Sequence, residues 1–166
     1  MAKVVMTCGM ICCGKSTYAK RLQAEGNAVI LSIDDITLTL FPDGSGDMHD
    51  TYALRAERYL LDLSLQILQT GADVILDWGL WTRAVRNRVR SFYASHEGIK
   101  TELHYLQIQP EEWNRRIEER NASGGNAYYV DEGLLNKCRS LFEEPSRDEV
   151  DVWVSPSFSS SCGKSE

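Results

Sequence analysis

Glycine, lysine and serine recur near the amino end at a spacing that suits phosphate binding. The segment 9–16 reads G-M-I-C-C-G-K-S, with Gly9 and Gly14 five residues apart and Lys15 and Ser16 directly after them. Glycines allow backbone conformations that a Cβ hinders, so successive N–H groups can turn toward one anion. The lysine amine can reach the outer phosphates of a nucleoside triphosphate, and the serine hydroxyl can hold a Mg²⁺ that bridges them. The other candidates for nucleotide contact in this loop are Cys12, Cys13 and Thr17.

Carboxylates follow two later apolar runs, where they could take part in phosphoryl transfer. Asp34 and Asp35 follow the run 28–33 (A-V-I-L-S-I), and Asp77 follows the run 74–76 (V-I-L). A carboxylate near Mg²⁺ and phosphate can accept the proton of an attacking hydroxyl, so Asp34 is the candidate base and Asp35 the alternative. The pair could instead cap a helix or lie in a solvated turn. Asp77 could hold the Mg²⁺ through water or contact the acceptor, or it could cap the next helix.

Two arginines, Arg116 and Arg120, are four residues apart and therefore share one face of a predicted helix. They precede a flexible break at 122–125, as the arginines of a closing lid over 115–130 would. Guanidinium groups suit this role because they bind phosphate oxygens bidentately and stabilise charge during transfer. The alternative is a solvated helix face on which they pair with Glu111, Glu112 or Glu119.

Apolar periodicity indicates which elements position these side chains. Helices are predicted at 15–25, 49–70, 83–95, 111–121 and 130–142, and strands at 4–8, 28–33, 73–76, 100–108 and 150–154. Asp47 or Asp50, Thr82 and Asp131 are the candidate helix caps. The segment 36–47 contains F-P-D-G-S-G, and its many turn residues predict an exposed loop. His49 is expected at the surface, and His104 is expected to have a structural or surface role.

Strands that alternate with helices predict an α/β fold, in which a five-stranded parallel sheet carries helices on both faces. Ligands of such sheets bind beyond the carboxyl ends of the strands. This geometry would bring the phosphate loop, the Asp34-Asp35 pair and Asp77 together. The sequence predicts one domain over 1–154 and a disordered polar tail over 155–166.

Composition restricts the partners of the chain. The net charge of −6 argues against a broad electrostatic grip on duplex nucleic acid. No apolar run approaches the ~20 residues needed to span a bilayer, and no signal peptide is recognisable. The odd number of cysteines, with no paired C-x-x-C sets, favours reduced thiols and a cytoplasmic location. For Cys12 and Cys13, tolerance of small residues at loop positions is favoured over a redox role.

Five segments together resemble the small P-loop kinases of the zeta-toxin, chloramphenicol-phosphotransferase and polynucleotide-kinase-like group. They are G-M-I-C-C-G-K-S-T at 9–17, S-I-D-D at 32–35, V-I-L-D-W-G-L-W-T-R at 74–83, R-x-x-x-R-N at 116–121 and F-E-E-P-x-x-D-E at 142–149. The resemblance implies the P-loop nucleoside triphosphate hydrolase fold and ATP as phosphoryl donor. It implies that Asp34 is the general base and that Arg116 and Arg120 are lid residues. It also implies that the acceptor pocket is bordered by Asp77, Trp78 and Arg83.

The leading hypothesis is an ATP- and Mg²⁺-dependent phosphotransferase that acts on a hydroxyl of a small molecule. Lys15, Asp34 and Arg120 are its candidate catalytic residues. A polynucleotide or nucleotide 5′-hydroxyl kinase is the alternative, but segment 36–38 (I-T-L) lacks the arginine that the polynucleotide kinases of this group carry there. A nucleotide-binding module without catalysis is a further alternative. A GTPase switch is disfavoured because Arg139 stands where the guanine-reading N-K-x-D motif requires aspartate.

Overall fold

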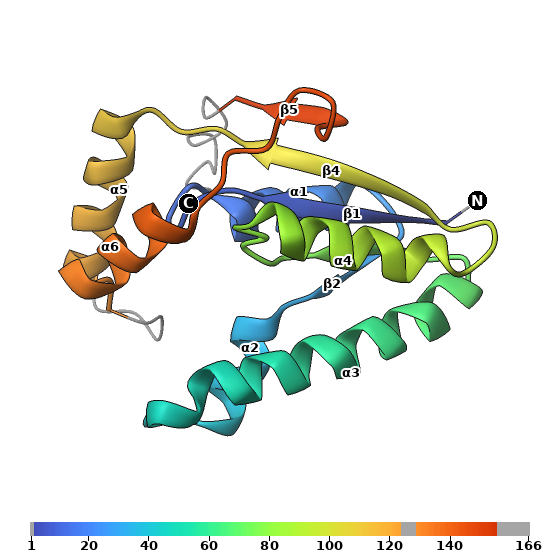
Figure 1. The fold of residues 1–166 in the computed structure, drawn as a ribbon, viewed down its shortest axis with the longest axis horizontal. Helices are drawn as coiled ribbons and strands as arrows, with labels where there is room; N and C mark the ends of the chain where they lie inside the picture. Colours follow the sequence, from blue (N-terminus) through green and yellow to red (C-terminus); the bar gives the residue numbers. More distant parts are fainter. Residues whose placement is uncertain (1, 124–128, 156–166) are drawn as a thin grey trace, which may run out of the picture.

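Residues 2–123 and 129–155 are described by a computed structural model. Their five strands form one parallel sheet in the order β2-β3-β1-β4-β5. The strands are β1 (Lys3–Cys8), β2 (Ala28–Leu31), β3 (Asp73–Leu76), β4 (Lys100–Leu106) and β5 (Val152–Val154). The helices are α1 (Lys15–Glu25), α2 (Ile33–Leu40), α3 (His49–Gln69), α4 (Arg83–Ala94), α5 (Pro110–Ser123) and α6 (Glu132–Leu141), with a short 3₁₀ helix η1 (Gly46–Met48) before α3. The predicted five-stranded parallel α/β architecture is confirmed (Figure 1).

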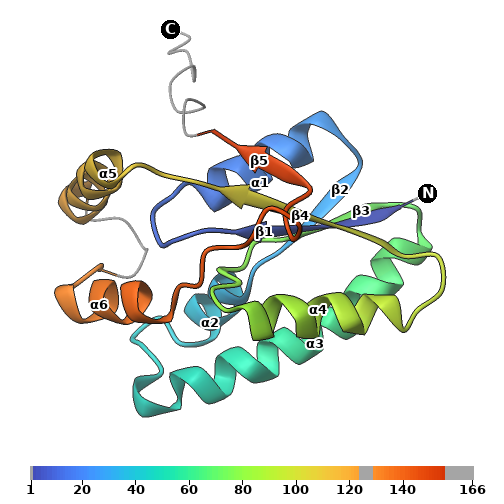
Figure 2. The same ribbon diagram turned by 45° about the horizontal axis from the view of Figure 1, so that its top comes forward.

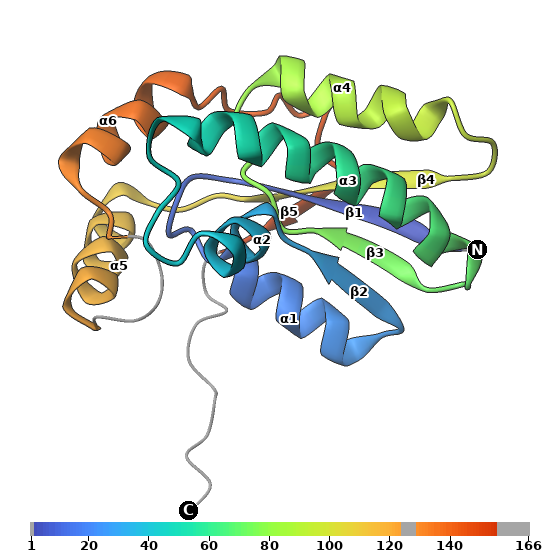
Figure 3. The same cartoon turned by 90° about the horizontal axis from the view of Figure 1, so that it is seen from below.

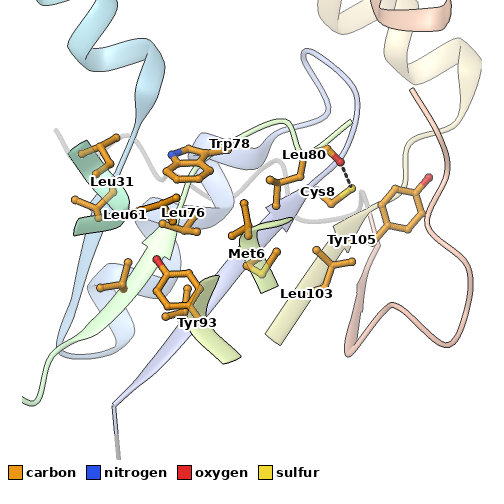
Figure 4. Packing of buried hydrophobic residues seen from close by; sticks show 14 residues of the cluster. Met6, Cys8, Leu31, Leu61, Leu76, Trp78, Leu80, Tyr93, Leu103 and Tyr105 are labelled. Carbon is orange, nitrogen blue, oxygen red and sulfur yellow. Dashed lines mark hydrogen bonds between the residues drawn. The ribbon is translucent and has the colours of Figure 1, made fainter. Parts of the chain in front are cut away.

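Helices cover both faces of the sheet, as Figure 3 shows, with α3 and α4 on one side and α1 on the other. Residues of β1 alternate between these faces because successive side chains of a strand point in opposite directions. Val4 and Met6 pack in the larger cluster with α3 and α4, whereas Val5 packs with Ala19 of α1. Figure 4 shows the larger cluster, which includes Leu61 of α3 and Tyr93 of α4 among its labelled side chains.

The helices α5 and α6 lie together beyond one end of the sheet (Figure 2). That end is the one at which the strands finish and the loop after β1 begins. Among the described residues, no helix has both the length and the apolar character needed to cross a membrane. Residues 156–166 of the predicted tail at 155–166 and residues 124–128 of the predicted lid lie outside the described ranges.

The segment after β2 differs from its prediction. The loop expected from residue 36 is wrong for its first part, because α2 extends from Ile33 to Leu40. Ser32 caps this helix by accepting a hydrogen bond from the Asp35 N–H at 3.1 Å. Thr37 is buried, and the apolar Ile33 and Ile36 pack against the main core cluster. The turn residues of this segment are confined to 41–46, and the apolar face before them forms a helix because its side chains are buried against the core.

Two of the predicted helix caps are present, and a third is not. Thr82 accepts from the Val85 N–H at 3.2 Å, and Asp131 accepts from the Leu134 N–H at 2.7 Å. The cap predicted for α3 from Asp47 or Asp50 is wrong, because Met48 takes the N-cap position and no side chain caps this end. The 3₁₀ helix η1 leads directly into α3, so neither carboxylate occupies the cap position.

Candidate active site

The loop between β1 and α1 has the backbone conformation that its glycines predict. Gly9 has φ +156°, and Gly14 has φ +102°. A Cβ on Gly9 would lie 2.6 Å from the Cys13 Sγ and 2.9 Å from the Leu106 carbonyl oxygen, so a side chain there would clash with backbone. Cys12 also has a left-handed φ of 61°. Left-handed residues in a loop that opens a helix turn several N–H groups toward one point, which creates an anion-binding concavity.

Lys15 begins α1 and folds back over this loop. Its Nζ donates to the Met10 carbonyl oxygen at 2.8 Å and to the Gly9 carbonyl oxygen at 3.1 Å. Ser16 and Thr17 follow in the first turn of the helix, and both side chains are exposed. The ammonium group and the two hydroxyls therefore stand at the helix N-terminus, where the backbone dipole also favours an anion.

A large cavity of about 1260 Å³ opens beside the loop. Its walls come from the loop, α2, α3, the segment after β3, α5 and α6. Most of the predicted site residues line it: Cys12, Gly14, Lys15, Ser16, Thr17, Asp34, Asp77, Arg116 and Arg120. The fold thus brings side chains that are more than 100 residues apart in the chain to one hollow at the carboxyl edge of the sheet.

Five predicted site residues do not line this cavity: Gly9, Cys13, Asp35, Trp78 and Arg83. Gly9 shapes the loop, and Cys13 is buried beneath it. Asp35 faces a separate apolar pocket between α2 and α3. Arg83 is turned toward the carboxyl-terminal segment, where its backbone N–H donates to Glu143.

Trp78 was expected at the acceptor pocket, but its side chain is 4% exposed and belongs to the main core cluster (Figure 4). The buried Thr7 hydroxyl donates to the Leu76 carbonyl oxygen at 2.9 Å and lies 3.3 Å from that of Trp78, so the backbone of this segment is held against β1. Two residues later Leu80 has φ +45°, which redirects the chain. As a result Trp81, not Trp78, lines the cavity.

Asp34 lies in the first turn of α2 with its carboxylate at the cavity wall. Loss of solvation raises the pKa of this carboxyl, and the positive charge of Lys15 opposes the rise. The neighbouring Asp77 carboxylate raises the pKa further, whereas His49 and Arg120 lower it. A carboxylate with a raised pKa in a cleft, close to a phosphate-binding lysine, has the properties of a proton acceptor.

Helix α5 is packed directly against the phosphate loop. The Trp113 indole N–H donates to the Ile11 carbonyl oxygen at 2.6 Å, and Trp113 packs in a small cluster that includes Met10 and Ile117. Arg116 donates to the Cys13 carbonyl oxygen at 2.9 Å. The loop and α5 therefore form one structural unit on this side of the cavity.

The two arginines of α5 differ in their contacts. Arg116 makes the pair with Glu112 that a solvated face would make, at 2.6 Å, but it also reaches the loop. Arg120 lies 3.6 Å from the Cys12 Sγ. The Arg120 Nε is buried and has no hydrogen-bond partner among the described residues. A buried donor beside a phosphate loop is well suited to an incoming anion, because a ligand oxygen would satisfy it.

Sequence reasoning missed several residues of the opposite wall. His49 was expected at the surface, yet it lines the cavity, and its Nδ1 lies 3.1 Å from the Ser45 hydroxyl. The same face of α3 contributes Asp50, Leu54 and Glu57 to the wall. Their spacing of three or four residues could have indicated a shared helix face, but nothing in the sequence says that this face turns toward the loop.

A buried arginine holds the wall after β3 in place. Arg86 is 1% exposed and pairs with Glu149, its Nε donating to the Glu149 Oε1 at 3.0 Å. Its Nη1 also donates to the carbonyl oxygens of Leu80, at 3.1 Å, and Glu143, at 2.9 Å. These contacts assign a structural role to the segment F-E-E-P-x-x-D-E, which binds Arg86 from the carboxyl-terminal side and so holds the wall after β3 in place.

The residues present are compatible with a bound Mg²⁺. No cluster of three or more His, Cys, Asp and Glu side chains that could hold a metal by itself occurs in residues 2–123 and 129–155. Ser16 and Asp77 do line the same cavity as the phosphate loop. This set fits a cation that takes only one or two protein ligands and shares the oxygens of a bound phosphate, which is the usual arrangement for Mg²⁺.

A glycine-rich loop between the first strand and the first helix, at the carboxyl edge of a parallel sheet, defines a P-loop nucleotide-binding protein. The chain belongs to the AAA domain family AAA_33, whose model matches residues 4–145. This membership confirms the resemblance to small P-loop kinases. No curated protein matches the chain significantly.

Solved structures confirm the fold at low sequence identity. A sugar kinase from Janibacter sp. HTCC2649 is 16% identical, with a TM-score of 0.65 over 95% of this chain and 87% of its own. The APS kinase CysC of Mycobacterium tuberculosis is 19% identical, with a TM-score of 0.60 over 93% of this chain and 88% of its own. A chain of the Pnkp1/Rnl/Hen1 RNA repair complex is 21% identical, with a TM-score of 0.67 over 84% of this chain but only 43% of its own.

Proposed function

We propose that this protein is an ATP-dependent phosphotransferase that moves the γ-phosphoryl group to a hydroxyl of a small molecule. The observation that carries the proposal is the position of Asp34, whose carboxylate lines the same cavity as Lys15 and the phosphate loop. A nucleotide-binding module without catalysis would have no use for a carboxylate with a raised pKa at this place. Two neighbours of the same fold are titled sugar kinase and APS kinase, which supports transfer to a small acceptor.

The donor would bind at the loop and under α5. The N–H groups of residues 9–14 and the Lys15 ammonium would neutralise the phosphate oxygens. Arg116 and Arg120 would stabilise the charge that spreads over the transferred group, with the buried Arg120 Nε supplying a free donor. In this proposal α5 is the first part of the lid over 115–130. Ser16 and Asp77 would hold Mg²⁺, which when bound neutralises phosphate charge and aligns the phosphate oxygens.

The acceptor would bind on the other side of the cavity, with its hydroxyl at Asp34. Asp34 takes the hydroxyl proton while the acceptor oxygen forms a bond to the γ-phosphorus. The bond between that phosphorus and the β–γ bridging oxygen breaks, and ADP leaves. Closure of the site against water would favour the hydroxyl over hydrolysis.

The direct test is a metabolite-pool screen with ATP and Mg²⁺. The pool is incubated with the protein, and mass spectrometry is used to find a compound that gains one phosphoryl group. Lys15→Ala is the control variant, since it removes the ammonium group from the phosphate site and should abolish the product. A product that forms equally with Lys15→Ala, or no product from any fraction of the pool, would contradict the proposed function.

A further inference from the structure

Opposite charges line the two sides of the cavity. Basic side chains of the donor side come from the start of α1 and from α5: Lys15, Arg115, Arg116 and Arg120. Lys137 of α6 also lines the cavity and lies beside Asp50 of α3. Carboxylates come from α2, α3 and the end of β3: Asp34, Asp50, Glu57 and Asp77. Glu119 and Asp131 also line the basic side, but Glu119 pairs with Arg115 and Asp131 caps α6. The donor side is therefore basic, whereas on the acceptor side four carboxylates outnumber Lys137.

Most carboxylates of the acceptor side are only weakly compensated. Asp50 lies 3.6 Å from Lys137, and both side chains are more than half exposed. An exposed pair of this kind contributes about 0–1 kcal/mol, so a ligand cation can replace Lys137 at little cost. Glu57 pairs with Arg88 at 2.6 Å, and its own side chain is 14% exposed whereas that of Arg88 is half exposed. Among the described residues, no ion pair within 4 Å holds Asp34 or Asp77.

The same wall carries apolar surface. Leu54 of α3 is 58% exposed and Leu141 of α6 is 42% exposed, although both are large apolar side chains. Val85 and Trp81 lie on the cavity wall as well. Leu54 lies between Asp50 and Glu57 on one face of α3, so carboxylate and apolar groups alternate there. Such a surface suits a ligand that carries both a cation and an apolar or ring-shaped body, and the Trp81 ring adds a possible cation–π contact.

We propose that the acceptor of this enzyme is an amino alcohol, in which a protonated amine binds the carboxylates of α3 and an apolar or ring-shaped body packs on Leu54 and Trp81. This inference rests on the proposed function and names its substrate class. An anionic acceptor would meet carboxylates of like charge, because every arginine that lines the cavity comes from α5 and Lys137 already lies beside Asp50. The ammonium group has no lone pair, so the hydroxyl remains the nucleophile, and the transfer at Asp34 proceeds as described above.

The first test separates the metabolite pool by charge before the screen. At neutral pH the pool is divided by ion exchange into cationic, neutral and anionic fractions, and each is incubated with the protein, ATP and Mg²⁺. The acceptor should appear in the cationic fraction and gain one phosphoryl group. An acceptor found in the neutral or anionic fraction, a nucleic acid included, overturns this inference and leaves the proposed function intact. No acceptor in any fraction overturns both.

The second test changes the wall and measures the two substrates separately. Glu57→Lys should raise KM for the cationic acceptor about 10-fold or more, the usual scale for a charge-assisted contact, and leave KM for ATP unchanged. Asp62→Lys is the matched control, because Asp62 is an exposed acid on the same helix that does not line the cavity. High salt should weaken the same acceptor binding by screening. An equal change in both variants, or none in Glu57→Lys, overturns the assigned position of the amine.

Discussion

Lys15 and Asp34 approach one cavity from different elements, and their charges affect each other. The ammonium group of Lys15 opposes the rise in the pKa of Asp34 that loss of solvation causes. Asp34 therefore lies next to the place where a phosphate would bind, with a pKa raised above the usual value in spite of the Lys15 charge. A carboxylate with a raised pKa is a better proton acceptor than an ordinary surface aspartate.

Replacing the proposed base should separate catalysis from nucleotide binding. Asp34→Asn keeps the size of the side chain but cannot take the proton, so kcat should fall by about 10²-fold or more while the affinity for ATP stays near that of the wild type. Asp35→Asn is the matched control, since Asp35 lines a different pocket. Calorimetry measures the affinity for ATP, and steady-state kinetics with the acceptor measure kcat.

The pH dependence of turnover is a second test of the role of Asp34. Because the pKa of Asp34 is raised, its carboxylate should become protonated, and turnover should fall, at a pH above the usual range for aspartate. The rate should recover as the pH rises through that value. An acid limb that persists in Asp34→Asn would assign the titration to another group.

At the scale of the elements, the wall after β3 depends on a pair that the sequence does not indicate. Arg86 lies on α4, and Glu149 follows α6, yet both are at most 5% exposed and bound to each other. The hydrogen bond from Arg86, opposed by desolvation and aided by Ser146, lowers the pKa of Glu149 from its usual 4.5 to about 2. A depressed carboxyl pKa stabilises the folded state above the ordinary value, and this contribution is lost as the pH falls from about 4.5 toward 2.

Breaking this pair should destabilise the fold strongly. Arg86→Met leaves the Glu149 carboxylate buried without its partner, so the free energy of unfolding should fall by about 3–5 kcal/mol. Arg83→Met is the control, because its ion pair with Asp148 is exposed and 3.9 Å long, and it should cost less than about 1 kcal/mol. Urea denaturation measures both. The double change Arg86→Met with Glu149→Leu should cost less than the two single changes added together, and simple additivity would argue against direct coupling.

At the scale of the whole molecule, the site joins segments from nearly the full length of the chain. The loop lies at 9–17, the carboxylates come from residues 34–77, and the arginines lie on α5. Only the folded chain brings these groups together, so a ligand that uses them binds the folded state and not the unfolded one. Binding of this kind stabilises the fold by mass action.

ATP should therefore raise the thermal stability of the protein, and the rise should grow with the logarithm of the ATP concentration above Kd. At 100 times Kd the stabilisation is about 2.7 kcal/mol, which corresponds to a rise in Tm of roughly 5–10 °C for a chain of this size. Lys15→Ala should lose this rise, whereas Lys20→Ala should keep it, because Lys20 is exposed on α1 and does not line the cavity. A full rise in Lys15→Ala would contradict the assignment of the phosphate loop.

Short-range chemistry determined the parts of this protein that the sequence predicted well. The phosphate loop is specified by eight consecutive residues, 9–16, and its glycines have the positive φ angles that their lack of a Cβ permits. The strands and helices follow from apolar periodicity, and their alternation leads to the parallel sheet. Because all strands end at one edge, the convergence of the loop, Asp34 and Asp77 also followed from the sequence.

Long-range packing decided the rest. The direction of Trp78 into the core and of Trp81 into the cavity depends on hydrogen bonds from Thr7 and on the turn at Leu80. The helix α2, predicted as part of a loop, forms because its apolar side chains find the core. The direction of the acidic face of α3 toward the cavity and the clamp at Arg86 depend on contacts between distant segments. Local spacing specifies what each segment can do, but only tertiary contacts fix which side chains face the ligand. These contacts form because they bury apolar surface between segments that are far apart in the sequence, so a short stretch of sequence does not reveal them.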